Sequence, residues 1–252
     1  MQGDNIKIIK NPRLATYKGR VDKMIFDDTY LIYLMIAITI PALAQMFLMS
    51  TFGKYSNVRA SSGMTGAQVA RRILDSNGLQ SVPVVETPGS LSDHYDPRSR
   101  TVRLSREIFH GTSLAAVAVA AHEVGHAIQH ATSYAPLTFR SAMFPIVNIA
   151  NKFGYLAIMI GFFAEMMNFA MLGIILVGIV VLFQLVTLPV EFNASTRALR
   201  QLDELNVFYS TEEKAGAKKV LTAAALTYVA GAVVAIAELV RYIVLMNRRS
   251  ND

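Results

Sequence analysis

The residues with the clearest chemistry in this 252-residue sequence are His122, Glu123 and His126, spaced as H-E-x-x-H. The surrounding residues 114–131 contain no proline, and serine or threonine just before them can cap a helix, so a helix is predicted. Positions i and i+4 share one helix face, which lets both imidazoles reach one metal ion. Glu123 lies about 100° around the helix, badly angled for a third ligand but able to take a proton from water. The pattern is typical of zinc hydrolases.

A chance match is the alternative, because only three of the five positions are fixed. The neighbouring residues 115–121 are all small or apolar, which predicts a buried helix. Two imidazoles and a carboxylate on a buried helix are costly without a partner, and a metal ion supplies one. Gly125 is expected to let another backbone approach the helix on the side away from the histidines. These surroundings favour the metal site.

Hydrophobic residues make up 53% of the chain and are gathered into long runs. The runs at 30–49, 168–188 and 220–246 are each long enough to cross a bilayer as a helix. A fourth run, 142–164, contains two asparagines and one lysine. We therefore expect a mainly α-helical integral membrane protein with four transmembrane helices and a small α+β module that carries the motif helix.

Composition excludes several classes of function. The chain has no cysteine, so neither disulfides nor thiol catalysis are available to it. Its net charge is +6, of which residues 1–23 contribute +4 through six basic and two acidic side chains. Basic residues do not alternate with aromatic ones on one face, so no nucleic-acid partner is expected.

The expected organisation follows the order of these features. Residues 1–23 are expected to be a leader or tail, either appended or native and disordered. A first transmembrane helix at 24–49 is followed by the α+β module with the motif helix at 50–135. The remaining parts are a transmembrane hairpin at 136–190, a third-ligand segment and loop at 191–219, and a last transmembrane helix with a tail at 220–252. The module is expected to hold a helix from Thr65 to Asn77, strands at 80–86, 91–95 and 101–105, and a short helix at 106–110. Pro189 is expected to end the third span.

Catalytic zinc usually has three protein ligands and one open position, so one ligand must lie outside the motif. Glu191 is the best candidate, because an unpaired carboxylate at the end of a span is costly. The intervening hairpin also returns the chain to the membrane face that carries the motif. The competing candidates are His130, His110, His94 and Glu107. Three histidines on successive turns do not converge readily on one tetrahedral ion, which disfavours His130.

From about residue 30 onward, the sequence resembles the YugP-type neutral zinc metallopeptidases, which are small bacterial membrane proteins. The resemblance rests on the motif helix and on four further segments: Ser56-Asn57-Val58, Asp93-His94-Tyr95-Asp96-Pro97, Leu104-Ser105 and Leu188-Pro189-Val190-Glu191-Phe192-Asn193-Ala194-Ser195. The layout is also similar to HtpX-type and CAAX-prenyl-protease-type enzymes, which place a zinc-binding glutamate in E-x-x-x-D after a membrane hairpin. Glu191 matches that glutamate, whereas Ser195 stands where those enzymes have aspartate.

The resemblance implies a membrane-embedded zinc endopeptidase that acts on membrane or membrane-associated proteins. Its Zn²⁺ would be held by His122, His126 and Glu191, with Glu123 as the general base. The expected partners are a protein or peptide substrate and membrane lipid, and another membrane protein or further copies of the chain stay open.

The group that stabilises the oxyanion is left open among His94, Tyr95 and Arg197. The strand near His94 is also suited to pairing with an extended substrate, although the residues around it equally fit a plain hairpin turn. Arg197 equally fits a solvated or lipid-facing charge.

Two other functions stay open. One is a catalytically silent scaffold or partner subunit with a structural zinc site, which the presence of Glu123 disfavours. The other is a small transporter with a chance motif, which the lack of any ionisable group in 168–188 disfavours.

The expected location is the bacterial inner (cell) membrane, with several spans and a cytoplasmic catalytic face. The loop at 193–219 carries five basic residues, and the short turn at 165–168 carries none. Short cytoplasmic loops are enriched in Lys and Arg. Two features disagree with a cytoplasmic catalytic face. Arg248 and Arg249, and also the basic residues of 1–23, would lie on the opposite side of the membrane.

Overall fold

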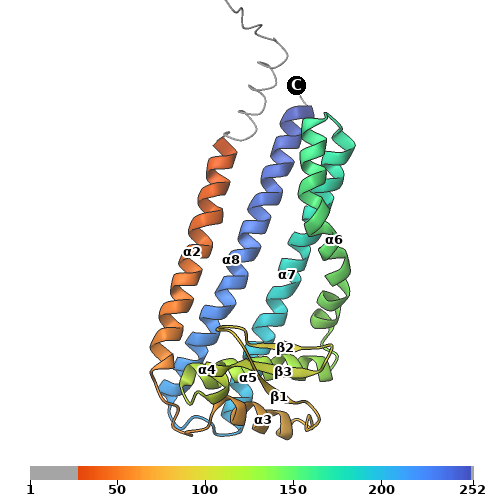
Figure 1. Ribbon diagram of the computed structural model, residues 1–252. Coiled ribbons are helices and arrows are strands. Elements are labelled where there is room, and N and C mark those ends of the chain that lie inside the picture. The colour runs from red at the N-terminus through yellow and green to blue at the C-terminus, as the bar shows by residue number, and fades with distance from the viewer. Residues whose placement is uncertain (1–27, 251–252) are drawn as a thin grey trace, which may run out of the picture.

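The computed structural model describes residues 28–250, so the segment expected to be a leader or tail, 1–23, lies outside the described residues. Four long helices run side by side, with a small module at one end of them (Figure 1). The helices are α2 (Asp28–Ser56), α6 (Ala135–Phe163), α7 (Met167–Glu204) and α8 (Thr211–Ser250). Each is long and apolar enough to cross a membrane, so the expected mainly α-helical membrane fold with a small α+β module is confirmed.

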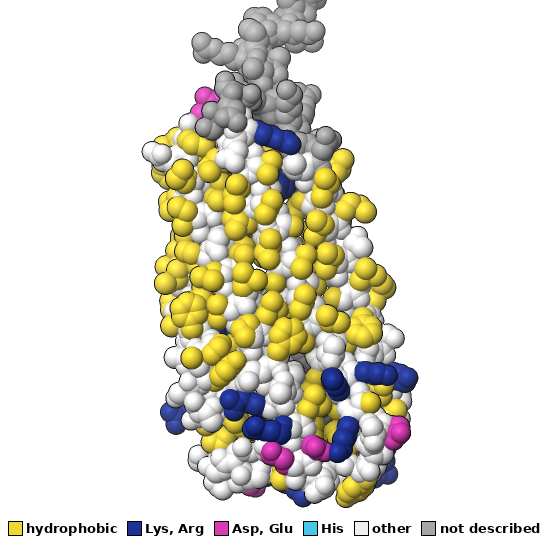
Figure 2. All heavy atoms as spheres, turned by 180° about the vertical axis from the view of Figure 1, so that it is seen from behind, with side chains coloured by type: hydrophobic (Ala, Val, Ile, Leu, Met, Phe, Trp, Pro, Cys, Tyr) yellow, Lys and Arg dark blue, Asp and Glu magenta, His cyan; other side chains and the backbone are white. Residues whose placement is uncertain are grey.

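The long helices form a row in which α8 lies between α2 and α7, and α6 packs on the other side of α7. The turn between α6 and α7 and the end of α8 lie opposite the module (Figure 1). On the face shown in Figure 2, hydrophobic side chains cover the helices, whereas most of the charged side chains gather toward the module. An apolar outer surface on helices of this length suits the hydrocarbon core of a bilayer.

Small residues bring α6 and α7 together as a tight hairpin. A Cβ atom added to Gly161 would lie 2.2 Å from the backbone nitrogen of Ala170, and one added to Gly173 would lie 2.6 Å from that of Ile158. Close backbone approach at small residues is a common way for membrane helices to pack without a hydrophobic driving force. The hairpin thereby brings α7 back to the module in a defined position.

The module holds a three-stranded sheet in the order β1 (Val84–Thr87), β3 (Thr101–Ser105), β2 (His94–Asp96). β1 runs parallel to β3, whereas β2 runs antiparallel to it, so β2 is an edge strand. Helix α3 (Gly66–Ser76) begins at a capping box formed by Thr65 and Gln68, and α4 (Arg106–His110) follows β3 directly. Both expected short helices are confirmed, and so is the pairing of the second strand with the third, but the second strand lies at 94–96 and not at 91–95, where Leu91 has a φ of 53° that does not suit a strand.

Helix α5 (Leu114–Ala131) carries the H-E-x-x-H motif and lies at the module end of the molecule (Figure 1). The Ser113 hydroxyl caps it by accepting a hydrogen bond from the Ala116 amide at 3.2 Å. α5 packs against α3, α7 and α8 and contacts two strands of the sheet, and most of its residues are buried. The motif therefore lies on the element that joins the module to the long helices.

The prediction that Pro189 ends the third span is wrong, because α7 continues without a break to Glu204. Proline removes one backbone N–H, and in membrane helices neighbouring polar side chains can compensate for that loss. The loss concerns one bond, to the carbonyl of Leu185 one turn earlier, and Tyr134 and Gln129 separately hold this part of α7 by donating to the carbonyls of Pro189 and Val190. The consequence is that Glu191 and Ser195 lie one turn apart on one continuous helix.

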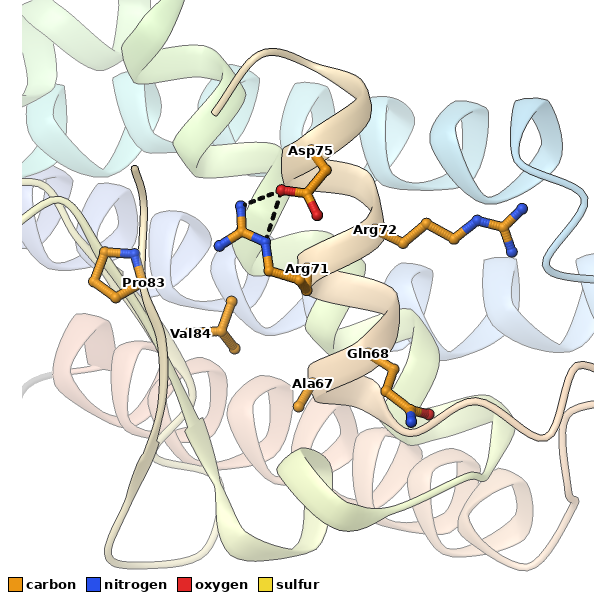
Figure 3. A pocket seen from close by; sticks show the side chains of 7 residues that line it. All are labelled: Ala67, Gln68, Arg71, Arg72, Asp75, Pro83 and Val84. Carbon is orange, nitrogen blue, oxygen red and sulfur yellow. Dashed lines mark hydrogen bonds and ion pairs between the residues drawn. The ribbon is translucent and has the colours of Figure 1, made fainter. Parts of the chain in front are cut away.

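The first strand is shorter than the predicted 80–86 and begins only at Val84. Arg71 of α3 accounts for the difference, because its guanidinium donates to the carbonyls of Leu79 and Val82 and holds that segment against the helix. Figure 3 shows Arg71 beside Asp75, to which it is also bonded, in a pocket between α3 and β1. None of the residues that line this pocket is a candidate site residue.

Candidate metal and catalytic site

His122, His126 and Glu191 converge on one point between α5 and α7. Their nearest ligand atoms all lie within 4.8 Å of one another. Oε2 of Glu191 lies 3.3 Å from Nε2 of His122 and 3.5 Å from Nε2 of His126. The histidine side chains are 14% and 13% exposed and the glutamate side chain 4%, so the cluster is nearly closed to solvent.

A glycine permits this convergence. A Cβ atom added to Gly125 would lie 2.6 Å from the carbonyl oxygen of Ala194, so the backbones of α5 and α7 are in direct contact there. The expectation that Gly125 lets another backbone approach is confirmed, but that backbone belongs to α7, which carries Glu191, and so does not lie on the side away from the histidines. Because Ala194 follows Glu191 by one turn, this contact sets the position of the carboxylate relative to the histidines.

The cluster fits a zinc ion. Ligand atoms about 2.0–2.2 Å from a tetrahedral zinc lie about 3.3–3.6 Å from one another, which brackets both measured separations. Within the described residues, Oε2 of Glu191 is buried without a hydrogen-bond partner. A buried carboxylate oxygen without a partner is costly, and a cation between it and the two imidazoles would remove that cost.

A buried amide fixes the tautomer of His126. Gln129 is fully buried, and its Nε2 donates to the carbonyl of Val190 at 2.8 Å and to Oδ1 of Asn193 at 3.0 Å. Its Oε1 must therefore accept, and the donor 3.0 Å away is Nδ1–H of His126. With the proton held on Nδ1, the lone pair of Nε2 is directed to the metal position.

His122 is held from α7. Its Nδ1 lies 3.1 Å from the hydroxyl of Ser195, which leaves Nε2 facing Glu191. Ser195 thus makes the contact to a ligand histidine although it is not the aspartate of the similar enzymes. Residues that orient metal-bound histidines in this way commonly govern metal affinity.

The charge around His126 favours a bound cation. Burial lowers the pKa of His126, but the nearby carboxylates of Glu191 and Glu123 outweigh it, so the pKa is raised. The same negative environment that holds a proton there would attract a metal ion, which competes for the same nitrogen. Glu123 itself is 8% exposed and close enough to His126 to act on it electrostatically.

The other predicted site residues do not join this cluster. His94 is exposed on β2, and its Nδ1 lies 2.7 Å from the carbonyl of Ser92. Tyr95 is hydrogen-bonded through its hydroxyl to Nδ1 of His130 at 2.8 Å. Arg197 donates to Oδ1 of Asn193 at 2.7 Å and stacks over the Tyr134 ring.

Two further candidate ligands are also placed elsewhere. His110 pairs with Glu86 at 2.8 Å, and Glu107 is exposed on α4. Among residues 28–250, the group of His, Asp and Glu side chains that closes on one point is therefore the pair on α5 with Glu191.

Four residues near the cluster were missed by reasoning from the sequence: Gln129, Arg140, Asn193 and Tyr228. Arg140 of α6 donates from Nη1 to Oε1 of Glu191 at 2.9 Å. Tyr228 of α8 lies beside Glu191 and Glu123, within reach of the Glu191 carboxylate. Gln129 and Asn193 stand inside the segments that carry the resemblance, whereas nothing in the sequence links Arg140 or Tyr228 to the motif.

Comparison with known proteins agrees with this geometry. A protein family described as "Putative neutral zinc metallopeptidase" matches residues 30–247. The "Putative membrane protease YugP" of Bacillus subtilis (strain 168) is 51% identical over 225 residues, which cover 87% of this chain and 100% of that protein. No solved structure matches the chain. The chain belongs to the neutral zinc metallopeptidase family, as a relative of YugP of Bacillus subtilis.

Proposed function

We propose that the protein is a membrane-embedded, zinc-dependent endopeptidase that hydrolyses peptide bonds of membrane or membrane-associated proteins. The observation that carries the proposal is the convergence of His122, His126 and Glu191, with the free carboxylate oxygen of Glu191 facing both imidazoles. A site of three ligands leaves one position open, as catalytic zinc sites do.

The three ligands would hold Zn²⁺, and each is supported by a neighbour. Ser195 orients His122, Gln129 orients His126 and Arg140 pairs with Glu191. Zinc bound there would polarise the substrate carbonyl and lower the pKa of water toward neutrality.

Glu123 is the general base in this proposal. It is buried on the motif helix beside the metal ligands, where its carboxylate can accept a proton from the attacking water. The same group then delivers that proton to the leaving amine, so that one residue serves both halves of the reaction.

The edge of β2 is the proposed substrate site. One side of β2 pairs with β3, and the other side is free within the described sheet to pair with an extended peptide. The hydrogen bond between Tyr95 and His130 ties β2 to the motif helix, so a peptide added to this edge would run beside the metal ligands. His94 is exposed on the same strand and would contact such a peptide.

Arg197 has a different proposed role. Its guanidinium is held by Asn193 and Tyr134, and Asn193 in turn accepts from Gln129. Arg197 would therefore act through this chain on His126 as a positioning residue, and would not touch the substrate.

The first test is the substitution Glu123→Gln. We expect zinc content and folding to be kept, and cleavage of an unfolded casein-like protein or of a membrane-protein substrate to fall by about 10²–10⁴-fold. Glu107→Gln on exposed α4 is the matched control and should cleave as the wild type does. Substantial turnover by Glu123→Gln would assign water activation to another group, and a wild type that holds zinc without any cleavage would favour a silent scaffold.

The second test removes the third ligand. Glu191→Ala should strip zinc from the purified protein and abolish cleavage, because two histidines alone do not make a catalytic zinc site. Metal analysis by mass spectrometry measures the loss directly. Full zinc occupancy in this variant would remove Glu191 from the site.

A further inference from the structure

Arg140 places a positively charged side chain at the edge of a site that is expected to bind a metal ion. It lies on α6, and its Nη1 donates to Oε1 of Glu191 at 2.9 Å. The Arg140 side chain is 27% exposed, whereas that of Glu191 is 4% exposed. A positive charge beside a metal site opposes metal binding, so its presence needs a reason beyond attraction for zinc.

The two oxygens of the Glu191 carboxylate have different partners. Oε1 accepts from Arg140, whereas Oε2 faces Nε2 of both motif histidines and has no hydrogen-bond partner in the described part of the chain. A carboxylate can bind a metal ion through one oxygen or through both. The contact with Arg140 occupies one of them.

We propose that Arg140 is a positioning residue that keeps Glu191 a one-oxygen ligand of the metal. The proposal rests on the function proposed above. With Oε1 bonded to the guanidinium, only Oε2 is available between the histidines, and a coordination position stays open for water and for the substrate carbonyl. The arginine also withdraws charge from the carboxylate, which leaves a bound zinc ion more electrophilic.

This role predicts an unusual combination of effects when the guanidinium is lost. Freeing Oε1 and removing a nearby positive charge should both favour the metal, so zinc should bind more tightly. Cleavage should nevertheless fall, because the second oxygen takes up the open position. A residue that merely fills space would give the opposite result for affinity, since a loosened site binds metal less well.

The experiment compares the wild type with Arg140→Met and Arg140→Lys in detergent. Arg200→Met is the matched control, because Arg200 lies on α7 and pairs only weakly with exposed Glu204 at 3.6 Å. Zinc affinity is measured by competition with a chelator. The coordination number is read from the visible absorption of the Co²⁺-substituted protein, which weakens as ligands are added to a tetrahedral ion.

For Arg140→Met we expect zinc affinity to rise about tenfold, the scale on which outer partners of metal ligands act. We also expect a several-fold weaker Co²⁺ absorption and a loss of cleavage of about tenfold or more. Arg140→Lys keeps a charged donor and should restore the wild-type spectrum. Arg200→Met should match the wild type in every measurement.

An Arg140→Met protein that is folded and has the wild-type spectrum and affinity would overturn the proposal, and so would a weakened affinity. X-ray absorption of the zinc-loaded wild type is a second measurement that needs no variant, and a two-oxygen carboxylate in that spectrum would also overturn it. A wild type that binds neither Co²⁺ nor Zn²⁺ would refute the proposed function itself. Cleavage that depends on Glu123 but is indifferent to Arg140 would refute only the present inference.

Discussion

At the scale of single residues, the candidate site depends on hydrogen bonds that decide which nitrogen of each histidine is free. Gln129 is the central residue in this respect, because its amide is buried and all its polar atoms are engaged. The amide bonds to the carbonyl of Val190 beside Glu191, so it links the orientation of His126 to the position of the third ligand. One side chain thus connects both elements of the metal site.

Replacing Gln129 by leucine should therefore weaken metal binding and folding together. We expect zinc affinity to fall about 10–100-fold, because Nδ1–H of His126 loses its acceptor. The free energy of unfolding should fall by about 1–3 kcal/mol, because the carbonyl of Val190 is left without its side-chain donor. Chelator competition and thermal unfolding measure the two effects.

The control for this prediction is Gln45→Leu, since Gln45 is exposed on α2 and has no role in the site. It should change neither zinc affinity nor stability. An unchanged zinc affinity in Gln129→Leu would show that the tautomer of His126 is fixed by another group.

At the scale of elements, local patterns in the sequence were sufficient to predict those helices and turns whose structure depends on residues within one short segment. The N-capping residues Thr65 and Ser113 and the apolar faces predict α3 and α5, and the turn between β2 and β3 is readable from its residues. The continuation of α7 past Pro189 was not predictable, because it depends on packing against other elements, and the contacts of Tyr134 and Gln129 with α7 come from segments far away in the sequence.

The same distinction applies to the candidate site. Glu191 could be paired with the motif because a hairpin of two spans returns the chain to the same face. Arg140 and Tyr228 could not, because each reaches Glu191 from a separate long helix and neither belongs to a recognisable motif. The pairing of distant helices depends on their packing, which the local sequence does not specify.

The contact between α5 and α7 at Gly125 gives the prediction at this scale. An added methyl group would lie 2.6 Å from the Ala194 carbonyl, so Gly125→Ala must push the two helices apart. We expect a loss of about 1–3 kcal/mol of stability, the usual cost of overpacking. Zinc affinity should also fall, because Glu191 would move away from His122 and His126. Thermal unfolding and chelator competition test both expectations.

Gly178→Ala is the matched control, because Gly178 lies on α7 and a Cβ atom there would meet nothing within 4 Å. That variant should be neutral or slightly more stable, since alanine favours a helix over glycine. Wild-type zinc affinity in Gly125→Ala would mean that the metal site tolerates a shift of α7.

At the scale of the whole molecule, the candidate site lies where the module meets the long helices. α5 carries two candidate ligands, α7 supplies the third from within its length, and α6 and α8 contribute Arg140 and Tyr228 beside it. A substrate anchored in the membrane would approach this level from the side, close to the edge of β2. The side of the membrane on which the module lies therefore decides which proteins it can meet.

We predict that the module lies on the cytoplasmic side of a bacterial cell membrane, because of the charges near the ends of the long helices. Residues 193–219, which form the end of α7, the turn after it and the start of α8 at the module end, carry five basic residues, which are Arg197, Arg200, Lys214, Lys218 and Lys219. The turn between α6 and α7, at the opposite end, has none. Arg248 lies at that opposite end and disagrees, but it is outnumbered, and Lys and Arg in short loops follow the cytoplasmic side.

Since the chain has no cysteine, its orientation can be measured with single cysteines placed at the two ends. Tyr209, which is 71% exposed, marks the module end, and Met166, which is 47% exposed, marks the turn between α6 and α7. With a membrane-impermeant maleimide, we expect Met166→Cys to be labelled in intact cells or spheroplasts, and Tyr209→Cys only after lysis. The opposite pattern would place the catalytic face outside the cytoplasm and would restrict its substrates to proteins exposed on that side.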